Sequence, residues 1–134
     1  MTKKIFVNGT FDIVHRGHIE LLNYARSLGD YLLVAIDSDK RVRELKGSSR
    51  PVNSHQDRKL LLENLKSVDS VMIFDSAQGL EHIIKVYEPD IMVKGSDYAD
   101  KPIIGAEYCK EIKFYQLVDG YSTTKKIQHI TNRG

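Results

Sequence analysis

Short apolar runs alternate with longer segments of helical periodicity along the chain, and this alternation limits the possible folds more than any other feature. The apolar runs are rich in β-branched and aromatic residues, which is typical of buried strands; they comprise residues 5–7, 31–36, 71–74, 91–93 and 112–118. Strands that alternate with helices form a parallel sheet covered on both faces. We therefore expect an α/β fold, a three-layer α/β/α sandwich with a five-stranded parallel sheet.

The helical segments carry recognisable start and stop signals. Residues 17–28 follow a three-to-four apolar spacing, and Gly29 with Asp30 is a natural stop. Ser54 precedes the next helix with a carboxylate three residues later, as in a capping box. Two further helices are expected over residues 80–87, which Pro89 closes, and over residues 123–129.

Composition and charge exclude several classes of protein. The 134 residues, of which 41% are apolar and 28% charged, are typical of one globular domain spanning residues 1–134. The net charge of +2, without an aromatic-basic platform, argues against a nucleic-acid partner. The chain has no apolar stretch of about 18 residues, so no membrane span is expected. The single cysteine, Cys109, and the lack of an N-terminal signal segment indicate the cytoplasm.

The loop after the first strand joins glycines to a pair of histidines. Sheets of this Rossmann-like kind bind ligands at the carboxyl ends of their strands, so the functional loops should follow residues 7, 36, 93 and 118. Gly9 allows close approach of a ligand to the backbone, and the helix that starts near Gly17 offers free N–H groups to a phosphate. His15 and His18 lie three residues apart at that helix start and can donate hydrogen bonds to phosphate oxygens. Two surface histidines, or half of a metal site, are the alternative.

This loop carries a family resemblance. Gly9-Thr10-Phe11-Asp12 followed by His15-Arg16-Gly17-His18 fits the pattern GTFDxxHxGH, which resembles the nucleotidyltransferase superfamily of cytidylyltransferases and related adenylyltransferases. The resemblance implies that His15 and His18 bind the triphosphate and stabilise the transition state, and that Gly9, Thr10 and Phe11 contact the nucleotide. It also implies a homodimer.

A second block near the C-terminus resembles the same family. Asp119-Gly120-Tyr121-Ser122-Thr123-Thr124 looks like the family's second motif, which implies nucleotide contacts for Gly120, Ser122, Thr123 and Thr124. An ordinary helix cap at Ser122 or Thr123 is the alternative.

Two loops between these motifs carry basic side chains. Lys46, Arg50 and Arg58 are expected on one turn-rich loop that closes over a polyanion, although a charge run is usually a solvated face. We interpret Lys46 as catalytic and acceptor-binding, Arg50 as acceptor-binding and Arg58 as nucleotide-binding. After the fourth strand, Lys94 is placed to reach a nucleotide phosphate; an ordinary turn is the alternative. The remaining acceptor contacts are expected from Asp12, Asp97 and Tyr98.

These loops also indicate a branch of the family. The patterns LKGxxRPVNxxxDR, from residue 45 to 58, and KGxDY, from residue 94 to 98, resemble heptose 1-phosphate adenylyltransferases. Glycerol-3-phosphate cytidylyltransferases carry Arg-Thr in the last motif, where this chain has Leu117-Val118. The resemblance implies transfer of AMP from ATP to a sugar 1-phosphate, with release of pyrophosphate and with Mg²⁺ bound to the nucleotide.

Other readings of the same residues stay open. A cytidylyltransferase that uses CTP and glycerol 3-phosphate, or another alcohol phosphate, shares the fold and both end motifs. A non-catalytic nucleotide-binding module would keep the glycine loops, although it need not keep both histidines. A protein metal site is not expected, because the other histidines lie on separate predicted helices and Cys109 stands alone; these histidines are His55, His82 and His129.

Overall fold

The computed structural model describes residues 2–116, which form a five-stranded sheet in the order β3-β2-β1-β4-β5 with every neighbouring pair parallel. The strands are β1 Lys4–Gly9, β2 Tyr31–Asp37, β3 Ser70–Phe74, β4 Ile91–Gly95 and β5 Glu111–Tyr115. All five expected strands are confirmed. The last one ends at Tyr115, earlier than expected, and residues 117 and 118 lie outside the described part.

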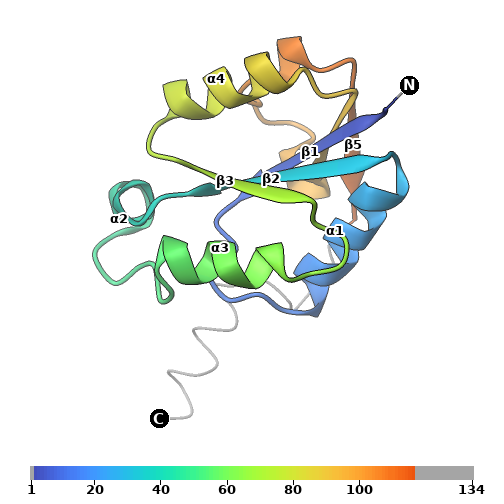
Figure 1. Ribbon diagram of the computed structural model, residues 1–134. Coiled ribbons are helices and arrows are strands. Elements are labelled where there is room, and N and C mark those ends of the chain that lie inside the picture. Colours follow the sequence, from blue (N-terminus) through green and yellow to red (C-terminus); the bar gives the residue numbers. More distant parts are fainter. Residues whose placement is uncertain (1, 117–134) are drawn as a thin grey trace.

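The helices cover both faces of this sheet, as expected for a three-layer sandwich. They are α1 Arg16–Ser27, α2 Asp39–Lys46, α3 His55–Glu63 and α4 Ala77–Tyr87, with short 3-10 turns η1 Ser96–Tyr98 and η2 Ala106–Tyr108. Figure 1 shows α4 on one side of the sheet and α1 with α3 on the other. The expected helix over residues 123–129 lies outside the described residues.

Helix boundaries follow the caps that the sequence contains. Ser54 accepts a hydrogen bond from the N–H of Asp57 and so starts α3 where expected. Ser76 caps α4 in the same way, so this helix begins three residues before the expected Leu80. The sequence analysis missed α2, which Ser38 caps through the N–H of Arg41.

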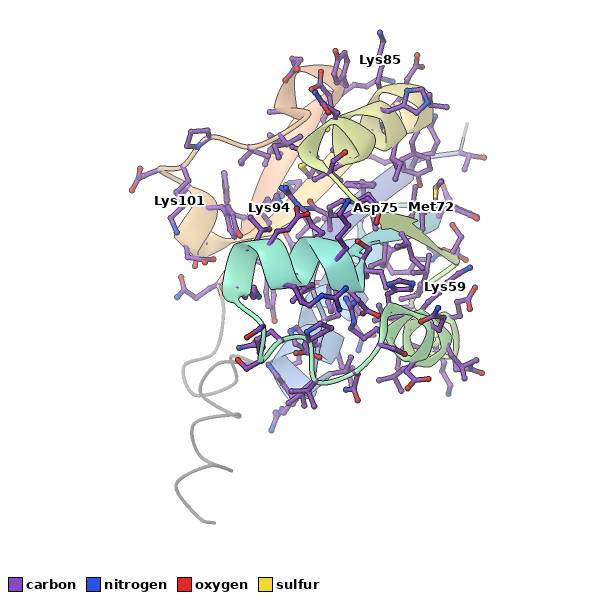
Figure 2. The ribbon with its side chains drawn as sticks, turned by 90° about the vertical axis from the view of Figure 1, so that its left-hand side faces the viewer. Lys59, Met72, Asp75, Lys85, Lys94 and Lys101 are labelled. Carbon is purple, nitrogen blue, oxygen red and sulfur yellow. The ribbon has the colours of Figure 1, made fainter. Side chains whose placement is uncertain are left out.

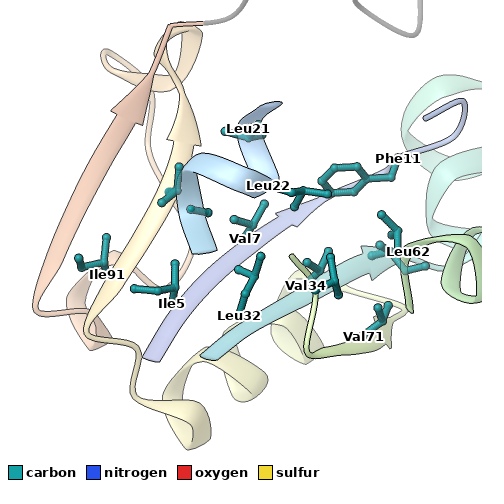
Figure 3. Close-up of a cluster of buried hydrophobic side chains, with 14 residues drawn as sticks. Ile5, Val7, Phe11, Leu21, Leu22, Leu32, Val34, Leu62, Val71 and Ile91 are labelled. Atoms are coloured by element: carbon teal, nitrogen blue, oxygen red, sulfur yellow. The ribbon is translucent and has the colours of Figure 1, made fainter. Parts of the chain in front are cut away.

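Two apolar clusters pack on opposite faces of the sheet. The first, in Figure 3, joins Ile5, Val7 and Val34 of the strands to Leu22 of α1 and Leu62 of α3. The second joins alternate residues of the same strands, such as Phe6 and Met92, to α4. Because side chains alternate along a strand, Asn8, Asp37 and Lys94 continue this second series at the carboxyl ends of β1, β2 and β4.

The strand order also locates the ligand crevice. The chain moves outward from β1 through β2 to β3, then returns to the other side of β1 at β4. Parallel sheets bind ligands outside the carboxyl ends of the strands at such a reversal. Among the described residues, no helix is long and apolar enough to cross a membrane.

Candidate active site

His15 and His18 form a capping box at the start of α1. The Nδ1 atom of His15 accepts a hydrogen bond from the N–H of Gly17 at 3.1 Å, and Nδ1 of His18 accepts one from the N–H of His15 at 3.3 Å. The two rings stack with centroids 4.0 Å apart. A neutral imidazole whose Nδ1 is an acceptor carries its proton on Nε2. The helix cap thus engages the Nδ1 atoms of both histidines and not their Nε2 atoms.

The surroundings of His18 keep its imidazole neutral. Burial, with smaller contributions from His15 and Lys46, lowers the pKa of His18 to about 4. The ring of Phe11 packs against it with centroids 4.9 Å apart. At neutral pH, His18 is thus a fixed hydrogen-bond donor without a charge.

Phe11 belongs to the core rather than to the ligand surface. Its side chain is 5% exposed and packs in the cluster under α1 and α3. Its φ of 50° is in the left-handed region, and a Cβ on Gly9 would lie 3.0 Å from the Phe11 ring. A side chain on Gly9 would therefore force this ring to shift. The expected side-chain contact between Phe11 and the nucleotide stays a prediction, and in this structure the ring is buried.

Asp12 holds a neighbouring loop in place. Its carboxylate, in a residue 1% exposed, accepts hydrogen bonds from the N–H groups of Val52 and Asn53 at 2.9 Å and from Nε of Arg50 at 3.3 Å. In return, Nδ2 of Asn53 donates to the Asp12 carbonyl at 2.6 Å. We expected Asp12 to contact the acceptor, but burial and these partners assign it to positioning Arg50.

Arg58 connects four segments around the site. It lies on α3, so its expected place on a flexible loop is wrong, and the residue is 1% exposed. Its guanidinium donates to the carbonyl oxygens of Asn53, Thr10 and Asp37 at 3.0, 2.9 and 2.8 Å and to Oδ1 of Asp39 at 2.9 Å. These bonds occupy four of the five N–H donors of an arginine. The buried guanidinium thus positions the loops, whereas its expected contact with the nucleotide stays a prediction.

Lys46 and Arg50 are two cations near the histidines, and the side chain of Arg50 is 12% exposed. Lys46 is the last residue of α2, not part of a loop as expected, and it is exposed. Burial of its ammonium, followed by the charge of Arg50, lowers the pKa of Lys46, while Asp37 and Asp12 oppose this. Because Lys46 also lowers the pKa of His18, the structure brings Lys46, Arg50 and the histidines into one electrostatic neighbourhood.

Lys94 lies at the carboxyl end of β4, where the sequence placed it. Figure 2 shows its side chain in the region between α2 and α4. The residue is 9% exposed, and its Nζ donates to Oδ1 of Asn8 at 2.8 Å. Burial lowers the pKa of Lys94 to about 8, although Asp37 and Asp97 oppose the shift. Tyr98 lies with its ring centroid 4.8 Å from the Lys94 ammonium. Asp97 and Tyr98 are exposed on η1.

The sequence analysis missed Asp37, the last residue of β2. It is 9% exposed, and Oγ1 of Thr10 donates to its carboxylate at 3.4 Å. Burial raises the pKa of Asp37 although Arg41, Lys46, the Thr10 hydroxyl and Arg58 all lower it. An acidic residue directly after a buried apolar strand was the signal that could have revealed it.

The second motif cannot be placed in this site. Gly120, Ser122, Thr123 and Thr124 lie outside the described residues. Within residues 2–116, no group of three His, Cys, Asp or Glu side chains could hold a metal ion. The described part of the site therefore combines two stacked imidazoles, the exposed Lys46, the mostly buried Arg50, and the buried Asp37 and Lys94, all at the carboxyl edge of the sheet.

Comparison with known proteins identifies relatives over nearly the whole chain. Residues 6–131 match the family model described as cytidylyltransferase-like. The bifunctional protein HldE of Campylobacter fetus is 48% identical over 126 residues, which cover 94% of this chain and 27% of that protein. HldE of Sulfurimonas denitrificans is 49% identical over 128 residues, covering 96% and 27%. The chain thus spans about a quarter of the length of these relatives.

Solved structures show the same architecture. The lipopolysaccharide core biosynthesis protein from Thermoplasma volcanium superposes with a TM-score of 0.71 and 26% identity, covering 88% of this chain and all of that one. Thermotoga maritima TmcAL, solved with alpha-thio ATP, superposes with a TM-score of 0.55 over 70% of this chain and 25% of that one. The second likeness, at 21% identity, concerns the fold alone.

Proposed function

The chain belongs to the cytidylyltransferase-like family of nucleotidyltransferases, and we propose that it transfers AMP from ATP to a sugar 1-phosphate such as a heptose 1-phosphate. The motif GTFDxxHxGH had predicted this family, and the prediction is confirmed. The observation that carries the proposed chemistry is the histidine capping box at the N-terminus of α1, in which the Nδ1 atoms of two stacked imidazoles accept hydrogen bonds from backbone N–H groups. Helix N-termini favour phosphate groups.

The proposed reaction is a direct displacement at phosphorus. An oxygen of the acceptor phosphate attacks the α-phosphorus of ATP, the bond from that phosphorus to the bridging oxygen breaks, and pyrophosphate leaves with the electron pair. A phosphate monoester is largely ionised at neutral pH, so the attack needs no strong general base. Catalysis then depends on alignment of two anions and on stabilisation of the charge that develops.

Several residues of the described site have a proposed part in this displacement. His15 and His18 donate from Nε2 to triphosphate oxygens as charge accumulates there. Lys46 and Arg50 attract the acceptor phosphate, and Asp12 fixes Arg50 by its hydrogen bond. Lys94 offers a further cation to a phosphate from the β4 side. The backbone of Gly9 and Thr10 borders the nucleotide.

We further propose that the glycine and hydroxyl groups of the C-terminal motif complete the triphosphate site, and that Mg²⁺ enters bound to the nucleotide. Mg²⁺ keeps several waters and usually binds through substrate phosphates and few carboxylates. When bound, it would neutralise charge on the triphosphate. The resemblance also supports a homodimer, and the use of ATP supports a cytoplasmic location. Light scattering of the purified protein tests the dimer.

A panel of donors and acceptors tests the proposed activity. Pyrophosphate release is measured with ATP or CTP, each with a heptose 1-phosphate or glycerol 3-phosphate, in the presence of Mg²⁺. We expect turnover with ATP and the heptose 1-phosphate. Turnover only with CTP and glycerol 3-phosphate would assign the alternative activity, and nucleotide binding without release of pyrophosphate from any pair would indicate a non-catalytic module.

A further inference from the structure

Asp37 is a buried carboxylate to which the proposed chemistry gives no task. The displacement needs no strong base, and a negative charge at the carboxyl edge opposes the binding of two phosphorylated substrates. Burial raises the pKa of Asp37, so its charged form is costly to keep there. The charges of Arg41, Lys46 and Arg58 compensate only part of this cost, because the pKa stays raised.

The position of Asp37 places it across β1 from Lys94. The order β2-β1-β4 puts the two strands on either side of β1, and alternation places Asp37, Asn8 and Lys94 on the face covered by α4. The histidines start α1, which packs on the opposite face. The carboxyl edge therefore has two sides, one formed by imidazoles and one by Asp37, Asn8 and Lys94.

The carboxylate of Asp37 has unused capacity for hydrogen bonds. The described side-chain bond to it comes from the Thr10 hydroxyl and is long, at 3.4 Å, whereas an ionised carboxylate can accept about four. The guanidinium of Arg58 donates to the Asp37 carbonyl oxygen rather than to its carboxylate. Free acceptor oxygens beside a phosphate-binding cation suit a ligand that has both a phosphate and hydroxyl groups.

We propose that Asp37 is a specificity-determining residue, whose carboxylate accepts hydrogen bonds from hydroxyl groups of the sugar acceptor. This inference rests on the proposed function, and it explains how the proposed active site selects its acceptor. The Lys94 ammonium, whose Nζ donates to Oδ1 of Asn8 at 2.8 Å, lies on the same face of the sheet as Asp37 and can bind an anionic group of the ligand. The Tyr98 ring beside Lys94 offers an apolar surface to the sugar carbons. These contacts fit an acceptor of one chemical class, a phosphate monoester with several hydroxyl groups.

A simple counter-ion role makes a different prediction. A carboxylate that only balanced the charges of Arg41, Lys46 and Lys94 would affect every phosphorylated ligand alike, since it would act on the cations. A carboxylate that accepts hydrogen bonds from hydroxyl groups of the ligand affects the binding only of ligands that have such groups. Ethyl phosphate, which has a phosphate and no hydroxyl group on its carbon chain, separates the two roles as a competitor of the acceptor.

The test compares Asp37→Ala with the matched control Asp75→Ala. Asp75 is exposed, directly follows β3 and is labelled in Figure 2. For Asp37→Ala we expect the KM for a heptose 1-phosphate to rise at least about tenfold, as for loss of hydrogen bonds to a charged group. The KM for ATP and the inhibition constant of ethyl phosphate should stay within about twofold, and Asp75→Ala should match the wild type.

Three results would overturn the assignment. These are an unchanged acceptor KM in Asp37→Ala, an equal rise in the inhibition constant of ethyl phosphate, or a rise confined to the KM for ATP. Thermal unfolding verifies that the variant folds; if it does not, Asp37→Asn decides, because its amide oxygen retains one acceptor and should cause a smaller rise in the acceptor KM. A wild-type protein that releases no pyrophosphate refutes the proposed function itself. An active wild type whose acceptor KM is unchanged by Asp37→Ala refutes only this inference.

Discussion

At the scale of single residues, the two histidines of the first loop differ from ordinary surface histidines by the hydrogen bonds that fix their rings. The backbone N–H groups of Gly17 and His15 each donate to an Nδ1 atom. For His18, whose pKa is lowered to about 4, the proton of the neutral ring is then on Nε2. A donor fixed before the substrate arrives needs no reorganisation during the reaction, so this neutral imidazole can serve a reaction in which negative charge increases.

Replacing His18 by alanine should therefore lower turnover at least about 100-fold, on the order of 2.7 kcal/mol, as for the loss of one preorganised donor. Pyrophosphate release at saturating substrates measures the effect. His82→Ala is the control, because His82 is exposed on α4. Near-normal turnover of His18→Ala would remove the histidine from the mechanism.

Lys94 should give the reaction a pH dependence above neutrality. Its pKa is lowered to about 8 by burial, so it is a cation below pH 8 and loses its charge as the pH rises through that value. Because the cation attracts phosphate, kcat/KM should fall above pH 8. In Lys94→Met, kcat/KM should be low throughout and should lack this fall. A wild-type profile that stays level to pH 9 would contradict the role of Lys94.

The individual roles could be predicted only in part from the sequence. His15 and His18 were identifiable because the motif lies within a few consecutive residues. Asp12 and Arg58 were recognised as important, but their roles in positioning the loops could not be predicted, since their hydrogen-bond partners lie about 40 to 50 positions away in the chain. Asp37 was missed because one carboxylate at a strand end has no local pattern.

At the scale of elements, Arg58 links α3 to the loops that carry the site. Arg58→Met would leave the carbonyl oxygens of Thr10, Asn53 and Asp37 without this donor. We expect the free energy of unfolding to fall by at least about 2 kcal/mol, because buried polar groups lose their partners. Urea unfolding followed by circular dichroism measures it.

The matched variant is Arg43→Met, in which an exposed arginine of α2 is replaced in the same way. Its free energy of unfolding should stay within about 0.5 kcal/mol of the wild type. Equal stability of the two variants would show that Arg58 does not hold these segments together.

Helix α2 shows why one element escaped the sequence analysis. Among its residues Asp39–Lys46, Val42 is the buried one, so no apolar stripe marks a helical face. The other helices have longer stripes and were found, with boundaries that shifted by a few residues. The strands were found because their β-branched runs are buried on both faces of the sheet.

At the scale of the whole molecule, the strand order brings residues that are far apart in the sequence together in one site. The reversal between β1 and β4 brings together the ends of β1, β2 and β4, which carry Asn8, Asp37 and Lys94. Alternating strands and helices predicted a parallel sheet with its site at the carboxyl edge, and the sheet is confirmed. The division of that edge into two sides depends on strand register and could not be predicted from spacing alone.

The central claim is that this edge joins a nucleoside monophosphate to a sugar phosphate. The most direct measurement is a ³¹P NMR time course with ATP, Mg²⁺ and a heptose 1-phosphate. The account predicts that the triphosphate signals are replaced by free pyrophosphate and by the two coupled resonances of an asymmetric diphosphate. Release of orthophosphate or of free AMP without that diphosphate, at any acceptor concentration, would contradict it.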